Sequence, residues 1–71
     1  MDTVAINGDM IRLGQLLKLA GVVGAGAEAK VLLADDAVTV NGEPEHRRGR
    51  QLHPGDVVEV LGQALTLVSG A

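Results

Sequence analysis

The sequence predicts an α+β domain in which two adjacent helices pack on a small, mostly antiparallel sheet. Apolar residues recur at helical spacing in two neighbouring segments of the first half. Short alternating apolar segments follow in the second half, separated by turn-forming pairs such as Asn41-Gly42. Helices followed by a run of strands are typical of the α+β class. The 71 residues suffice for one small domain, which we expect to span residues 1–71.

The first half is expected to hold one short strand and two helices. Residues 3–6 follow a strand pattern that stops at the turn pair Asn7-Gly8. From Ile11 on, the spacing becomes helical, and Gly21 is a suitable end for this helix. A glycine-rich connection over residues 22–26 leads to a second helix over residues 27–35. The apolar faces of the two helices are expected to consist of Leu13, Leu16, Leu17 and Ala20, and of Ala29, Leu32 and Leu33.

From Val38 on, the apolar pattern becomes that of strands. We predict strands at residues 38–40, 57–60 and 64–68, with the hairpin signal Asn41-Gly42 after the first of them. Pro44 lacks an N–H group and therefore limits the returning strand to an edge. The strand at residues 3–6 is expected to pair with this sheet, because an isolated strand is not stable.

The composition excludes several classes of protein. The chain has no cysteine, so it can form neither a disulfide nor a thiolate metal site. It also has no Phe, Tyr or Trp, so bases cannot stack on aromatic side chains. No apolar run approaches the roughly 18 residues of a membrane span, and the N-terminus lacks the features of a signal peptide. We therefore expect a cytoplasmic protein without membrane contact.

A basic segment at residues 46–50 stands out in a chain whose net charge is −3. It holds Arg47, Arg48 and Arg50, half of the six basic side chains, next to His46. Guanidinium groups match phosphate oxygens, and Gly49 lets a ligand approach the backbone. Nearby glutamates could equally balance a solvated charge cluster, so the segment alone leaves both interpretations open.

Catalysis and cofactor binding find little support in the sequence. Residues 24–29 match a dinucleotide-binding fingerprint, but a helix precedes them where that motif needs a strand. Lys30 lacks the neighbours of a phosphate-binding loop. His46 and His53, seven residues apart in a turn-rich stretch, do not define a metal site or a general base with a partner. We expect no enzyme, no cofactor, no metal and no small-molecule substrate.

The order of these segments resembles the RNA-binding domain named after small-subunit ribosomal protein S-four (the S-four domain, whose helical core is called the αL motif). The chain is most similar in pattern to the stand-alone bacterial YbcJ-like proteins, and the resemblance covers nearly all of it. The residues that carry it are Arg12-Leu13, Leu16-Leu17-Lys18-Leu19, Gly26-Ala27, Ala29-Lys30, Val38-Thr39-Val40-Asn41-Gly42, the basic segment and Pro54-Gly55-Asp56-Val57-Val58.

The resemblance implies a non-catalytic, ribosome-associated module whose partner is structured RNA, ribosomal RNA in particular. It implies phosphate contacts rather than base recognition. The residues expected to make these contacts are Lys18, Lys30, Arg47, Arg48 and Arg50, joined by His46 and Arg12. Two departures from the family pattern lower the positive field, namely Ala25-Gly26 where many members have Ser-Arg, and Asp36 beside Asp35 where Gly is usual. Weaker RNA binding than in a typical member is therefore expected.

A second functional class remains an alternative, that of a protein-interaction or carrier module. The segment from Val38 to Val60 is also similar to ubiquitin-like sulfur carriers. Those proteins end in Gly-Gly, whereas this sequence ends in Ser69-Gly70-Ala71, and they have one main helix where two adjacent helices are expected here.

Overall fold

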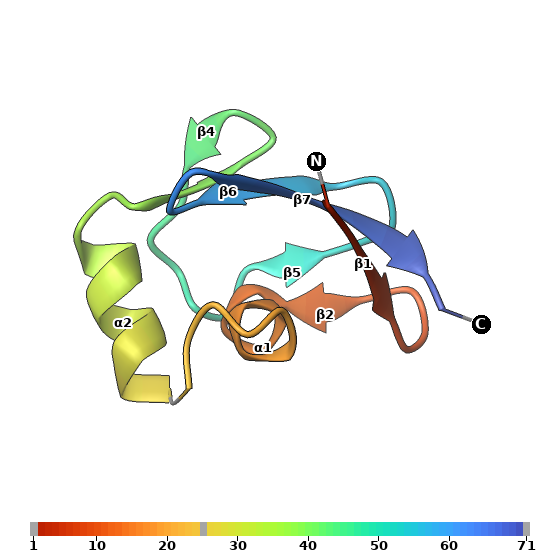
Figure 1. The fold of residues 1–71 in the computed structure, drawn as a ribbon, viewed down its shortest axis with the longest axis horizontal. Coiled ribbons are helices and arrows are strands. Elements are labelled where there is room, and N and C mark those ends of the chain that lie inside the picture. The colour runs from red at the N-terminus through yellow and green to blue at the C-terminus, as the bar shows by residue number, and fades with distance from the viewer. Residues whose placement is uncertain (1, 25, 71) are drawn as a thin grey trace.

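A computed structural model describes residues 2–24 and 26–70 of the chain (Figure 1). Ala25, in the connection between the helices, and the terminal residues Met1 and Ala71 lie outside the described residues. The elements follow in the order β1 (Asp2–Ile6), β2 (Ile11–Arg12), α1 (Leu13–Leu19), α2 (Gly26–Ala34), β3 (Val38–Val40), β4 (Glu43–Pro44), β5 (Gln51–Leu52), β6 (Val57–Val60) and β7 (Gln63–Ser69).

The chain is α+β, and its helices are adjacent. The prediction of one small, mostly antiparallel sheet is wrong. The main sheet has five strands in the order β1-β7-β6-β3-β4, and β2 pairs with β5 in a separate two-stranded sheet. Strand β1 runs parallel to β7 from the pair Asp2 and Leu65 to the pair Ile6 and Ser69, while the other neighbours are antiparallel. A parallel pair needs a long crossover connection, and nearly the whole chain lies between β1 and β7. The sheet is therefore mixed, and it dominates the fold.

The second sheet also changes where the first helix begins. Ile11 pairs with Leu52 and Arg12 with Gln51, so these two residues are extended and α1 begins only at Leu13. The helix ends as the sequence predicts, with Gly21 just beyond it at a φ of 74°. Left-handed backbone of this kind favours glycine, which has no Cβ.

The core lies between α1 and the main sheet, with α2 at one end of the molecule (Figure 1). Helix α2 lies beside α1, so the two helices are adjacent as the sequence predicts. Of its predicted apolar face, Ala29 and Leu33 are buried and Leu32 is only partly buried. The remaining buried apolar side chains are Ile6, Leu13, Leu16, Leu17, Val23, Val38, Val40, Leu52, Val58, Val60, Leu65 and Leu67.

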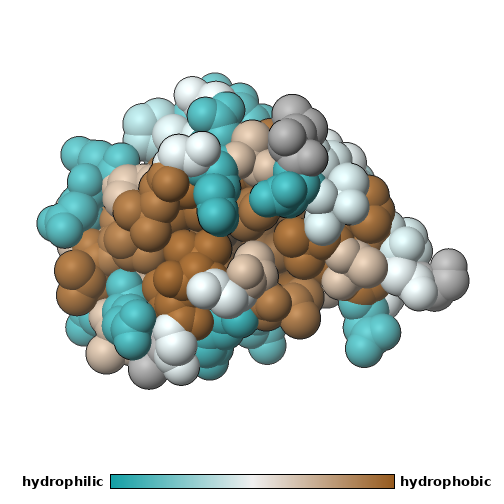
Figure 2. All heavy atoms as spheres, viewed as in Figure 1, coloured by the Kyte–Doolittle hydropathy of each residue, from teal (hydrophilic) through white to brown (hydrophobic). Residues whose placement is uncertain are grey.

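Apolar side chains also reach the surface. Figure 2 shows them extending over much of the face seen in Figure 1. The large ones with the greatest exposure are Leu61, Val31 and Leu19. Within the described residues, neither helix has the length and apolar character needed to cross a membrane.

Candidate nucleic-acid interface

The basic side chains of the second half lie on one loop, residues 45–50, which we call the basic loop. It connects β4 with β5 and is bound to the start of α1. The backbone N–H of Gly14 donates to the carbonyl of Arg48, and that of Leu13 donates to the carbonyl of Arg50, both at 2.9 Å. N–H groups in the first turn of a helix have no partner within the helix. The basic loop satisfies two of them, and this fixes the loop against α1.

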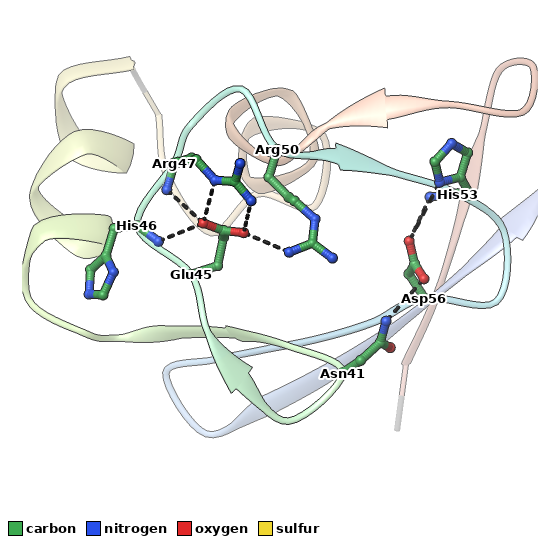
Figure 3. Close-up of polar contacts among 7 residues, drawn as sticks. All are labelled: Asn41, Glu45, His46, Arg47, Arg50, His53 and Asp56. Atoms are coloured by element: carbon green, nitrogen blue, oxygen red, sulfur yellow. Dashed lines mark hydrogen bonds and ion pairs between the residues drawn. The ribbon is translucent and has the colours of Figure 1, made fainter.

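Glu45 lies at the centre of the basic loop with only 7% of its surface exposed (Figure 3). Its Oε2 accepts hydrogen bonds from the backbone N–H groups of His46 and Arg47, at 3.0 and 3.1 Å. Arg47 also donates from its side chain, with Nε 3.1 Å from Oε2 and Nη2 3.1 Å from Oε1. Arg50 Nη1 donates to Oε1 at 2.7 Å. The buried carboxylate is thus surrounded by donors from its own loop.

These bonds determine the ionisation of the carboxyl group. The hydrogen bonds from the Arg47 and Arg50 side chains hold the pKa of Glu45 far below its ordinary value, and burial opposes this only in part. The same interaction raises the pKa of Arg47. Glu45 is therefore an anion that neutralises part of the positive charge of its loop.

Three of the predicted cations share one groove between α1 and the basic loop. Arg12, Lys18 and Arg48 line it together with Gly14, Gln15, Ala29 and Gly49, and its volume is about 390 Å³. The Arg12 side chain is held in place because Nη1 donates to the carbonyl of Gly49 at 3.1 Å.

Arg48 can enter the groove because residue 14 has no side chain. A Cβ built on Gly14 would lie only 2.5 Å from Arg48 Cγ. The stem of Arg48 therefore lies directly across the helix backbone.

The other predicted site residues lie outside this groove. Arg47 is exposed over 73% of its side chain and Arg50 over 35%, and both line a second hollow beside it. His46 binds the carboxylate of Asp36 through Nε2. Lys30 is exposed on α2 and is not among the residues that line the groove. Of the seven predicted side chains, three therefore line the groove and two line the hollow beside it, whereas His46 and Lys30 line neither.

Sequence reasoning missed two residues that organise this surface, Glu45 and Gly14. The sequence offered Glu45 only as one of the glutamates that could balance a solvated charge cluster, although its position two residues before one arginine and five before another is a usable signal. Gly14 stands within a helical pattern, where glycine costs about 1 kcal/mol relative to alanine, and such a glycine often marks a close contact. Among the described residues, no group of three or more His, Asp or Glu side chains is arranged to hold a metal ion.

The fold and the basic surface define a small domain of the kind that the sequence pattern resembles, and comparison with known families agrees. The chain belongs to the S4 domain family, whose model matches residues 4–68. The predicted resemblance is thereby confirmed.

Two relatives illustrate this membership. The chain is 52% identical over 61 residues, 86% of both chains, to the Bacillus subtilis (strain 168) protein named "Probable ribosome maturation protein RlbA". It is 34% identical over 59 residues, 83% of this chain and 84% of the relative, to "Putative RNA-binding protein YbcJ" of Escherichia coli (strain K12).

Proposed function

We propose that this chain is a non-catalytic RNA-binding module that holds structured ribosomal RNA in the cytoplasm through phosphate contacts. The observation that carries the proposal is the groove in which Arg12, Lys18 and Arg48 converge. Guanidinium and ammonium groups bind phosphate oxygens through charge-assisted hydrogen bonds. Membership in the S4 domain family and the names of the two relatives support the same function. They favour it over a sulfur carrier.

In this proposal, residues outside the groove also contribute to phosphate binding. Arg47 bonds Glu45 through Nε and Nη2, so other N–H groups of its exposed guanidinium remain available to a second phosphate. Arg50 and Lys30 contribute to the positive field around these two positions, and His46 adds to it in its protonated form. Asp36, whose negative charge is unfavourable for RNA, is partnered by His46. The expectation of weaker binding than in a typical member stays part of the proposal.

A salt titration of RNA binding tests the function. Fluorescence anisotropy with labelled fragments of bacterial ribosomal RNA gives the affinity of the wild-type chain at several salt concentrations. If about four phosphates are engaged, affinity falls roughly 100-fold between about 50 and 200 mM salt. No binding to structured RNA, or binding that salt leaves unchanged, contradicts the proposal.

Two variants with the same charge change test the groove itself. Arg48→Gln removes a cation inside the groove, and Lys30→Gln removes one outside it. We expect Arg48→Gln to weaken binding about tenfold and to reduce the salt slope by about one, with a smaller loss in Lys30→Gln. Equal losses in the two variants would mean that only the general field matters, and would remove the groove from the proposal.

A further inference from the structure

The buried carboxylate of Glu45 is the one charge of the basic loop that phosphate binding does not explain. An anion beside an RNA-binding surface repels phosphate, and burying it costs free energy unless it is fully partnered. Glu45 is nevertheless buried within the loop, with only 7% of its surface exposed. Glu43, two residues earlier on β4, is exposed. Charge alone would favour a neutral residue at position 45.

The contacts of Glu45 suggest what it does. Oε2 binds two successive backbone N–H groups, those of His46 and Arg47, and so fixes the start of the loop. Oε1 joins the side chains of Arg47 and Arg50, which would otherwise repel each other. Because Arg47 is held through both Nε and Nη2, the plane of its guanidinium group is fixed while most of its side chain stays exposed (Figure 3).

The far part of the loop has its own anchor. The carbonyl groups of Arg48 and Arg50 accept hydrogen bonds from the first turn of α1, and the Arg48 side chain crosses Gly14 into the groove. Arg47 and Arg48 therefore lie between a carboxylate on one side and a helix start on the other. Each point of attachment limits the conformations that these arginines can adopt before any ligand is present.

We propose that Glu45 is a positioning residue for RNA binding, whose carboxylate holds the basic loop so that Arg47 and Arg48 face neighbouring phosphates. Long side chains that are already ordered lose less freedom when they bind. The proposal rests on the proposed function and leads to a result opposite to simple electrostatics. Glu45→Gln makes the chain more positive, yet it weakens RNA binding.

The test compares two variants with the same charge change. Glu45→Gln and Glu43→Gln each remove one negative charge, but only position 45 contacts the arginines of the loop. Both are titrated with the same labelled ribosomal RNA fragments, at a temperature where circular dichroism shows each variant folded. We expect Glu45→Gln to bind about fivefold to tenfold more weakly than wild type and Glu43→Gln to bind as tightly or slightly more tightly. Binding by Glu45→Gln that equals or exceeds that of Glu43→Gln overturns the proposal.

A double-mutant cycle separates positioning from a general loss of structure. If Glu45 acts through Arg47, the binding losses of Glu45→Gln and Arg47→Gln are strongly non-additive. Additive losses overturn the proposal. Should Glu45→Gln fail to fold, Glu45→Asp keeps the charge on a shorter side chain, and it is expected to weaken binding. Wild-type affinity in that variant overturns the proposal too.

The outcome also distinguishes this inference from the proposed function. Tight, salt-dependent binding by wild type and a loss in Arg48→Gln support the function whatever position 45 does. Failure of wild type to bind would instead end both.

Discussion

Replacing Glu45 by glutamine should cost much of the stability of this small domain. The carboxylate accepts two backbone and three guanidinium hydrogen bonds. A glutamine offers one oxygen in place of two and turns an NH₂ group toward donors. Removing one partner of a buried ion pair costs about 3–5 kcal/mol. The bonds from Arg47 are discounted because its side chain is 73% exposed. We therefore expect a loss of about 2–3 kcal/mol in the free energy of unfolding near neutral pH.

The loss depends on pH in a direction that the pKa fixes. The pKa of Glu45 is lowered in the folded protein, so its stabilising contribution is complete above the ordinary value of 4.5. The contribution disappears as the pH falls from there toward the folded-state pKa, because the unfolded chain binds the proton first. The stability difference between wild type and Glu45→Gln should therefore narrow steadily in acid.

Thermal melts followed by circular dichroism measure both effects. A loss of about 2–3 kcal/mol corresponds to a decrease of roughly 10–20 °C in Tm for a domain of this size. Glu43→Gln serves as the control, since it changes the same charge at an exposed position. The reasoning is refuted if the two variants have the same Tm near neutral pH. It is also refuted if the difference in stability between wild type and Glu45→Gln does not narrow between neutral and acid pH.

Three further predictions concern the backbone around the site and the turns of the sheet. Gly14→Ala should displace Arg48, whose Cγ lies 2.5 Å from the added Cβ. We expect RNA affinity about fivefold lower in anisotropy titrations, whereas unchanged affinity would show that Arg48 has room to move. Asn41→Ala should lower the free energy of unfolding, measured by urea denaturation, by about 2 kcal/mol. The Asn41 side chain donates to Asp56 and accepts from the Val57 N–H, and its φ of 53° suits asparagine better than alanine. A loss within about 0.5 kcal/mol, the usual range for surface substitutions, would contradict this. Leu61→Asn should raise stability by about 0.5–1 kcal/mol, since Leu61 is 64% exposed at a φ of 50°, a backbone conformation that asparagine tolerates better. A lower Tm in that variant would contradict it.

Local patterns predicted the helices and hairpin strands because each of these elements carries its own periodicity or stop. The end of α1 could be predicted because Gly21 is a glycine, the residue that best tolerates the left-handed backbone found there. The direction of β1 could not be predicted, because the same apolar pattern serves a parallel or an antiparallel neighbour. Strands β2 and β5 have two residues each, which is too short for any periodicity. These elements depend on tertiary pairing alone.

The candidate site shows the same division between local and tertiary information. The cluster of arginines was evident, and so was the possibility that glutamates balance it. The difference between Glu43 and Glu45 could not be predicted, because the two have the same chemistry and similar surroundings in the sequence. Burial separates them, and burial depends on how the chain after β4 returns toward Val38, whose carbonyl accepts the N–H of Glu45 at 3.1 Å.

The net charge of −3 is a poor guide to this surface because the charges are unevenly distributed along the chain and some of the nearby acids already have partners. All six Lys and Arg side chains lie between residues 12 and 50. Two acids of the same region, Asp36 and Glu45, are bound to His46 and to the loop arginines. Salt-bridged acids present less negative charge to an approaching phosphate than free ones would. On the proposed function, binding then depends on the direction in which the remaining cations point, and one of the chain's own negative charges sets that direction.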